Sequence, residues 1–187
     1  MAETKRDKAT LLANLADNQA AAVTPEHVRD LLESLDASRS AYYWTNNTTT
    51  TFTLQGSGGP GGSNFYKLNG NTSGKTNNRF SVTQNRATYN GAPNLKVDAF
   101  CAFSFSMDGG PYDIAFEFYH NGVSVPSSYQ VVRAGGAGEI VHISMMAEVT
   151  GLVSGDYIEV WAANESAANR VFTPKAGYVN IQEMAIA

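Results

Sequence analysis

The sequence contains a single cysteine, Cys101, among its 187 residues. An intrachain disulfide is therefore impossible, and the apolar alternation VDAFCAFSF around Cys101 predicts a buried thiol rather than a reactive one. No stretch approaches the ~20 apolar residues that a membrane-spanning helix needs. The basic residues of the first ten positions are not followed by the apolar run of a secretory signal. We therefore expect a soluble product made in a cytoplasm.

Positive charge is also scarce. The chain has 13 Lys and Arg against 17 Asp and Glu, a formal net charge of -4 at pH 7. Surfaces that bind nucleic acid or anionic membranes carry a clustered excess of Lys and Arg, and the sequence has no such cluster. We expect neither nucleic acid nor membrane as a partner.

Signatures of cofactor and metal sites are missing. Residues 70–78, GNTSGKTNN, contain a Gly-Lys-Thr, but three residues rather than four separate Gly70 from Gly74, and no helical pattern follows. This spacing excludes a phosphate-binding loop. His27, His120 and His142 fall on three separate predicted elements without metal-ligand spacing. We predict no cofactor, no metal and no catalytic residue.

Four carboxylates of the second half, Asp108, Asp113, Glu117 and Asp156, are the remaining candidates for a calcium site or a glycosidase pair. Nothing in the sequence brings them together, so we interpret them as solvated side chains. A structural or binding role is favoured by elimination. A polysaccharide depolymerase is the enzymatic alternative, and it requires a cleft with paired carboxylates about 5 to 9.5 Å apart.

The first 40 residues differ in character from the rest of the chain. Residues 1–39 hold 12 of the 30 formal charges, and their apolar residues follow helical spacing. Thr24 and Pro25 are suited to the N-cap and first position of the second helix. Short helices are marginal alone, so their apolar stripes need a partner surface. The predicted anchor residues are Leu11, Leu12, Leu15, Val28, Leu31, Leu32 and Leu35.

From residue 41 onward the apolar period changes to two, which is typical of an antiparallel β-sandwich. Asn121-Gly122 is the clearest tight turn. The glycine-rich residues 54–64 predict a long surface loop, or alternatively a flexible linker. The predicted strands are 48–55, 79–84, 95–107, 112–122, 139–149, 155–164 and 177–186.

The strand predicted at 155–164 carries large aromatics on the side away from the core. Alternation directs Ile158, Val160 and Ala162 to the core and places Tyr157, Glu159 and Trp161 on the opposite face. Large aromatic patches rarely remain bare on a monomer. Either neighbouring subunits or a loop of the same chain must cover them.

Residues 149–164, VTGLVSGDYIEVWAAN, and 175–187, KAGYVNIQEMAIA, resemble the last two strands of the tumour-necrosis-factor and complement-head superfamily of trimeric jelly rolls. The resemblance implies a mainly β fold, with a jelly-roll head at 41–187 behind a helical segment at 1–40, and a homotrimer. It also implies that the outer face of the strand at 155–164 lines the threefold axis. The trimer-interface residues expected from it are Tyr157, Trp161, Phe100, Ala102 and Tyr178.

Residues 11–38, LLANLADNQAAAVTPEHVRDLLESLDAS, resemble the leader of tailed-bacteriophage and prophage virion appendage proteins. This resemblance implies a non-enzymatic capsid-decoration or head-fibre protein, located in the virion after synthesis in the bacterial cytoplasm. Its partners would be itself and a capsid or other virion protein bound through residues 1–40. The alternative is a tail-fibre or receptor-binding tip, whose loops at 56–64 or 70–78 would contact a host glycan or protein.

Overall fold

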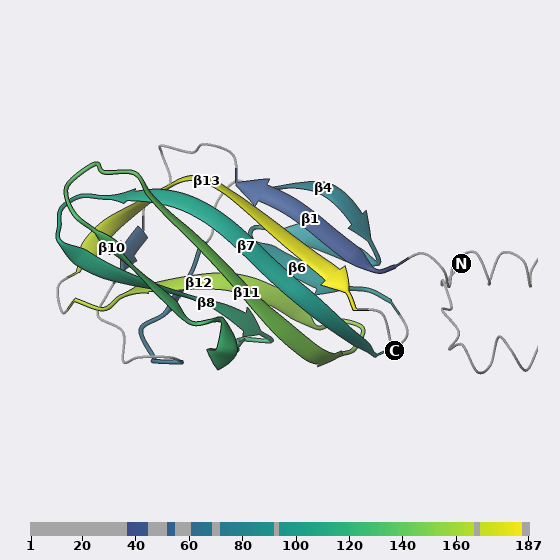
Figure 1. Cartoon of the computed structure of the whole chain (residues 1–187). Helices are drawn as coiled ribbons and strands as arrows, with labels where there is room; N and C mark the ends of the chain where they lie inside the picture. The colour runs from purple at the N-terminus through teal and green to yellow at the C-terminus, as the bar shows by residue number, and fades with distance from the viewer. Residues whose placement is uncertain are drawn as a thin grey trace, which may run out of the picture.

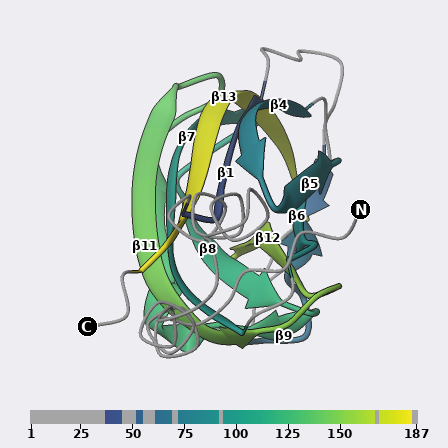
Figure 2. The same ribbon diagram turned by 90° about the vertical axis from the view of Figure 1, so that its right-hand side faces the viewer.

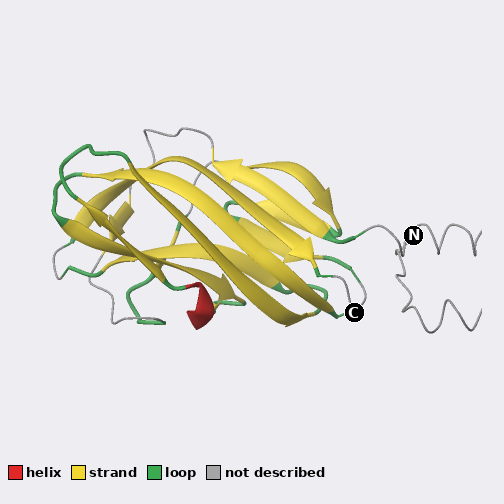
Figure 3. Ribbon diagram, viewed as in Figure 1, coloured by secondary structure: helices red, strands yellow, loops and turns green. Residues whose placement is uncertain are grey.

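The computed structural model describes residues 37–44, 52–54, 61–68, 72–91, 94–166 and 169–184, and almost all of its regular structure is β (Figure 3). Within these residues the one helical element is a 3-10 turn, η1, at Pro126–Ser128. The same residues contain no helix long and apolar enough to cross a membrane.

Two antiparallel sheets form the described part of the chain, and they lie in two layers (Figures 1 and 2). Sheet A has the order β11-β7-β13-β1-β4, with β2 beside β13, and sheet B has the order β10-β8-β12-β6-β5, with β3 beside β12 and β9 beside β8. The strands of sheet A are β1 (Arg39–Trp44), β2 (Phe52–Leu54), β4 (Thr72–Asn78), β7 (Leu95–Met107), β11 (Val141–Leu152) and β13 (Arg170–Glu183). The strands of sheet B are β3 (Tyr66–Lys67), β5 (Phe80–Thr83), β6 (Arg86–Tyr89), β8 (Tyr112–His120), β9 (Val123–Ser124), β10 (Gln130–Ala134) and β12 (Tyr157–Asn164).

The order of the strands is that of a jelly roll. Eight strands, β1, β6, β7, β8, β10, β11, β12 and β13, divide into the sheets β1-β13-β7-β11 and β6-β12-β8-β10. The first strand pairs with the last, and the remaining pairs nest inside it, which is the pattern of a rolled-up antiparallel ribbon. The expected mainly β jelly-roll sandwich is confirmed by this topology.

Alternation of inward apolar residues with outward residues of mixed character produces the core between the sheets. Along β7, every second residue from Leu95 to Phe105 is buried, and the residues between them are exposed or half-buried. The rings of Phe105 and Phe172 stack with centroids 4.8 Å apart, and Phe116 packs 5.3 Å from Phe105. The predicted core positions Ile158, Val160 and Ala162 and the predicted buried thiol of Cys101 are confirmed, with exposures of 0 to 1%.

Two-residue turns close two of the hairpins in sheet B. Asn121 and Gly122 have φ angles of 52° and 76° and connect β8 to β9, so the predicted tight turn is confirmed. Gln84 and Asn85, with φ angles of 46° and 61°, connect β5 to β6 in the same way. This second turn lacks glycine and was not predicted.

The structure corrects the interpretation of residues 70–78. Residues 72–78 form β4, which pairs with β1, instead of a surface loop. Their polar, glycine-containing sequence lacks the apolar alternation by which the other strands were predicted. The host-contact loop expected there is therefore replaced by a strand.

β1 begins at Arg39, two residues before the predicted domain boundary at 40/41, and neither β1 nor β10 was among the predicted strands. The seven anchor positions of the leader lie outside the described residues. They are Leu11, Leu12, Leu15, Val28, Leu31, Leu32 and Leu35.

Candidate functional site: the two outer faces of the sandwich

The five residues expected at one subunit interface are divided between the two sheets. Tyr157 and Trp161 belong to β12 of sheet B, whereas Phe100 and Ala102 belong to β7 and Tyr178 to β13 of sheet A. Their side chains point away from the core, and the outer faces of two stacked sheets point in opposite directions. The expectation of one continuous surface is therefore wrong. Alternation identified the outward side of each strand but not the sheet to which the strand belongs.

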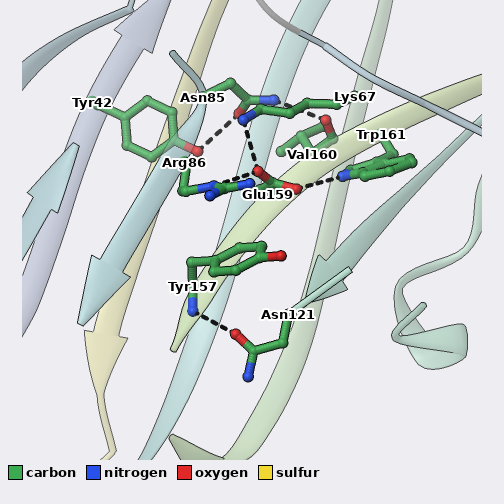
Figure 4. A network of polar contacts seen from close by, with 9 residues as sticks. All are labelled: Tyr42, Lys67, Asn85, Arg86, Asn121, Tyr157, Glu159, Val160 and Trp161. Carbon is green, nitrogen blue, oxygen red and sulfur yellow. Dashed lines mark hydrogen bonds and ion pairs between the residues drawn. The ribbon is translucent and has the colours of Figure 1, made fainter. Parts of the chain in front are cut away.

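Around Tyr157, Glu159 and Trp161 the outer face of sheet B carries a network of polar contacts, shown in Figure 4. We call this outer face the covered face. Glu159 lies at its centre and is 1% exposed. Its Oε1 accepts a hydrogen bond from Arg86 Nε at 2.7 Å and lies 2.7 Å from Lys67 Nζ, and its Oε2 accepts one from Trp161 Nε1 at 3.0 Å. Arg86, Lys67 and Trp161 therefore all contact the carboxylate of Glu159.

The surroundings of Glu159 keep it ionised. Burial by itself would raise the pKa of this carboxyl, but hydrogen bonds from Lys67, Arg86 and Trp161 outweigh burial and lower the pKa below its ordinary value. A charge held in this way orients its neighbours, and the guanidinium of Arg86 lies 3.8 Å from the ring centroid of Tyr157. The network therefore joins β3, β6 and β12 through one buried carboxylate.

A segment of the same chain, residues 61–68, covers the part of this face around Trp161 and Tyr119. Its β3 pairs with β12 at Trp161 and Ala162, and Phe65 is 5% exposed. Phe65 packs 5.9 Å from Tyr119 and 6.4 Å from Tyr129, ring centroid to ring centroid. Tyr119 in turn stacks on Trp161 at 4.3 Å. Trp161 is thus covered by its own chain, which is the second of the two expected alternatives. These rings form a second small core on the outer side of sheet B.

Glu117 holds the beginning of the covering segment. It is fully buried on the outward side of β8 and accepts hydrogen bonds from Gly61 N at 3.0 Å and Ser124 Oγ at 2.6 Å. Gly61 has a φ of 67°, and a Cβ there would lie 3.3 Å from the side chain of Ser124. The expectation that Glu117 is solvated is wrong, because a segment more than fifty residues earlier in the chain covers it.

The other three candidate carboxylates do not join Glu117. Asp113 pairs with Arg133 at 3.2 Å, and Asp108 is exposed. Asp156 accepts hydrogen bonds from Asn121 Nδ2 at 2.6 Å and Val153 N at 2.9 Å. In the described part of the chain no three His, Cys, Asp or Glu side chains gather as metal ligands do.

Asp156 instead fastens two turns at the end of sheet B. Its Oδ2 lies 3.2 Å from His120 Nε2, and Asn121 Oδ1 accepts a hydrogen bond from Tyr157 N at 2.9 Å. Burial alone would raise the pKa of Asp156, but hydrogen bonds from Val153, Asn121 and His120 outweigh burial, so the pKa is lowered. Asp156 thus links the turn at Asn121 to the turn that precedes β12.

The outer face of sheet A, unlike that of sheet B, leaves large apolar side chains uncovered by the described residues. Three large apolar side chains remain accessible on its outer face: Phe100 at 37%, Met146 at 65% and Tyr178 at 39%. They form one patch across three neighbouring strands, because Met146 pairs with Phe100, and Tyr178 pairs with Ala102 two residues along β7. We call this surface the open face.

A hollow of about 640 Å³ lies beside this patch on the open face. The hollow is present because the small side chains of Ala102, Ser104 and Ala176, which form much of its lining, extend little above the sheet. A bulge in β13 between Pro174 and Ala176 lies at this hollow. At the bulge, Ser104 Oγ accepts a hydrogen bond from Ala176 N at 3.2 Å. The complete lining is Ala102, Phe103, Ser104, His142, Ile143, Ser144, Ala176, Gly177 and Tyr178.

No family model matches the sequence, and a search of curated proteins finds no match. Many solved structures are similar to this chain, among them the following two. The globular domain of the zebrafish complement 1qA protein is 12% identical, covering 81% of this chain and 100% of its own, with a TM-score of 0.49. The tumour necrosis factor Eiger from S. frugiperda is 11% identical, covering 80% and 95%, with a TM-score of 0.43. At these values the likeness carries no functional conclusion, and the jelly-roll assignment rests on the strand order.

Proposed function

We propose that this chain is a non-enzymatic virion structural protein of the capsid-decoration or head-fibre type. Its β-sandwich forms a homotrimer through the open face of sheet A, and residues 1–40 attach the trimer to the particle. The patch of Phe100, Met146 and Tyr178 is the observation that carries this proposal.

The open face has the composition of a protein interface. Aromatic residues and Met are enriched where proteins meet, and charged residues are depleted there. On the open face the nearest charges, Asp98 and Glu148, lie on the next outward positions beyond Phe100 and Met146, at the edge of the apolar patch. These observations support a subunit contact that involves Phe100, Ala102 and Tyr178 of the expected set.

Tyr157 and Trp161 then stabilise the subunit and not the trimer. Trp161 already stacks on Tyr119, and Tyr157 already lies under Arg86, so their contacts are formed within one chain.

The number of copies and the virion location come from sequence resemblance. The strands at 149–164 and 175–187 resemble those of a trimeric superfamily, and residues 11–38 resemble a virion leader. Three leaders on one trimer bind at high effective concentration, so weak single attachments add up to a firm one.

Attachment is tested by deletion of residues 1–40 and by the double substitution Leu31→Asp, Leu32→Asp in the full chain. Each variant is mixed with particles that lack the native protein, and bound protein is measured after sedimentation of the particles. We expect both variants to remain folded trimers that no longer bind. A truncated protein that binds as well as the full chain would assign docking to the sandwich instead.

A further inference from the structure

Within the described residues, His142 is the one histidine on the open face. It is exposed on β11, lines the hollow, and pairs across the strands with Ser104. Its outward neighbours Ser144, Ser104 and Ala102 carry no charge. No carboxylate therefore faces the imidazole from the strand beside it.

The charged groups of the neighbouring elements are distant or already engaged. Glu148 lies six residues along β11, roughly 20 Å away at 3.3 Å per residue, and it pairs with Lys96 at 2.7 Å. Glu139, three residues before His142, accepts hydrogen bonds from the amides of Gly135 and Gly136.

On the other neighbouring elements, Arg133 of β10 pairs with Asp113, and Lys175 of β13 follows Pro174 at the bulge. Among the described residues, none of these charged groups forms an ion pair with His142.

We propose that protonation of His142 weakens the contact between copies of this chain at the open face. The inference rests on the proposed function, since it describes the regulation of the same interface. Histidine is the side chain that gains its charge between pH 5 and 8. Covering the hollow with a second copy removes water from the imidazole and disfavours its charged form. Closed symmetry repeats this effect in every copy.

The direction of the pH dependence follows from linkage. The assembled state binds protons less readily than the separated subunits, so assembly is strongest above neutral pH and weakens as pH falls. If covering disfavours the protonated form tenfold, association falls about tenfold for each histidine once all are protonated.

Sedimentation of the full chain at about pH 8 and about pH 5.5 tests this, because carboxylates stay ionised in this window while histidines titrate. We expect trimers at the higher pH and at least tenfold weaker association at the lower pH. His142→Gln should associate equally at both pH values, and His142→Lys should be weakened at both. Far-ultraviolet circular dichroism confirms that each variant is folded.

The other two histidines provide matched controls. His27→Gln and His120→Gln should each retain the loss of association at low pH. A parent protein that forms equally strong trimers at both pH values would overturn this inference and leave the proposed function standing, as would a His142→Gln variant that still dissociates. A parent that is monomeric at the higher pH would overturn both.

Discussion

The covered face and the open face both carry large aromatics on outward positions of their strands, but among the described residues a segment of the chain lies over the covered face alone. On the covered face, Phe65 of residues 61–68 packs against Tyr119, and Lys67 pairs with Glu159. On the open face, Phe100 and Met146 have no such cover from the described residues and remain 37% and 65% exposed. Equivalent positions in the two sheets thus differ: on the covered face they stabilise the subunit, and on the open face we propose that they contact other copies.

The largest difference between the two faces is expected when the ring of Phe65, which packs over the covered face, is removed. Phe65→Ala leaves a void against Tyr119 and Tyr129, and large-to-small substitutions at buried aromatics cost about 3 to 5 kcal/mol. Phe100→Ala, at a position 37% exposed within the subunit, should change the unfolding free energy of the separated subunit far less. Urea denaturation of both variants measures the difference. Equal losses would mean that Phe65 does not seal a core.

A second contrast uses one glutamate from each face. Glu159→Gln removes the charge that Lys67 and Arg86 share, and we expect a loss of about 2 kcal/mol in unfolding free energy, less than for a fully buried pair because Arg86 reaches solvent. Glu148→Gln, at an exposed ion pair with Lys96, should cost less than about 1 kcal/mol. Midpoints of chemical denaturation at neutral pH report both values.

Acid should remove the advantage of Glu159. Because its pKa is lowered in the folded protein, the stabilisation is complete above the unfolded pKa and is lost as pH falls through the folded pKa. The difference between the parent and Glu159→Gln should therefore be largest above about pH 5 and shrink below about pH 4. Denaturation curves across this range measure it, and a difference that grows toward acid would contradict the network in Figure 4.

Much of the fold was predictable because the alternation of apolar residues is local. The pattern predicted β7 and β12, the core residues of β12 and the burial of Cys101, and Asn121-Gly122 predicted a turn. β4 and the turn at Gln84-Asn85 were missed, because the sequence of β4 is polar and the turn lacks glycine.

The site was less predictable because its contacts are distant in sequence. Glu159 meets Arg86 across 73 residues, and Glu117 meets Gly61 across 56. Alternation predicts that both carboxylates point away from the core, and it therefore suggests that both are exposed to solvent. Only the path of residues 61–68 across sheet B shows that they are buried.

The central claim is that copies of this chain meet at the open face, and the mass of the full chain with and without Met146→Asp tests it most directly. Met146 is 65% exposed in the subunit, so an aspartate there leaves the subunit folded but brings carboxylates into the contact between copies. By sedimentation equilibrium the parent should have three times the chain mass of 20.0 kDa, and the variant should have the mass of one folded chain. A monomeric parent, or a variant that remains a trimer, would contradict the account.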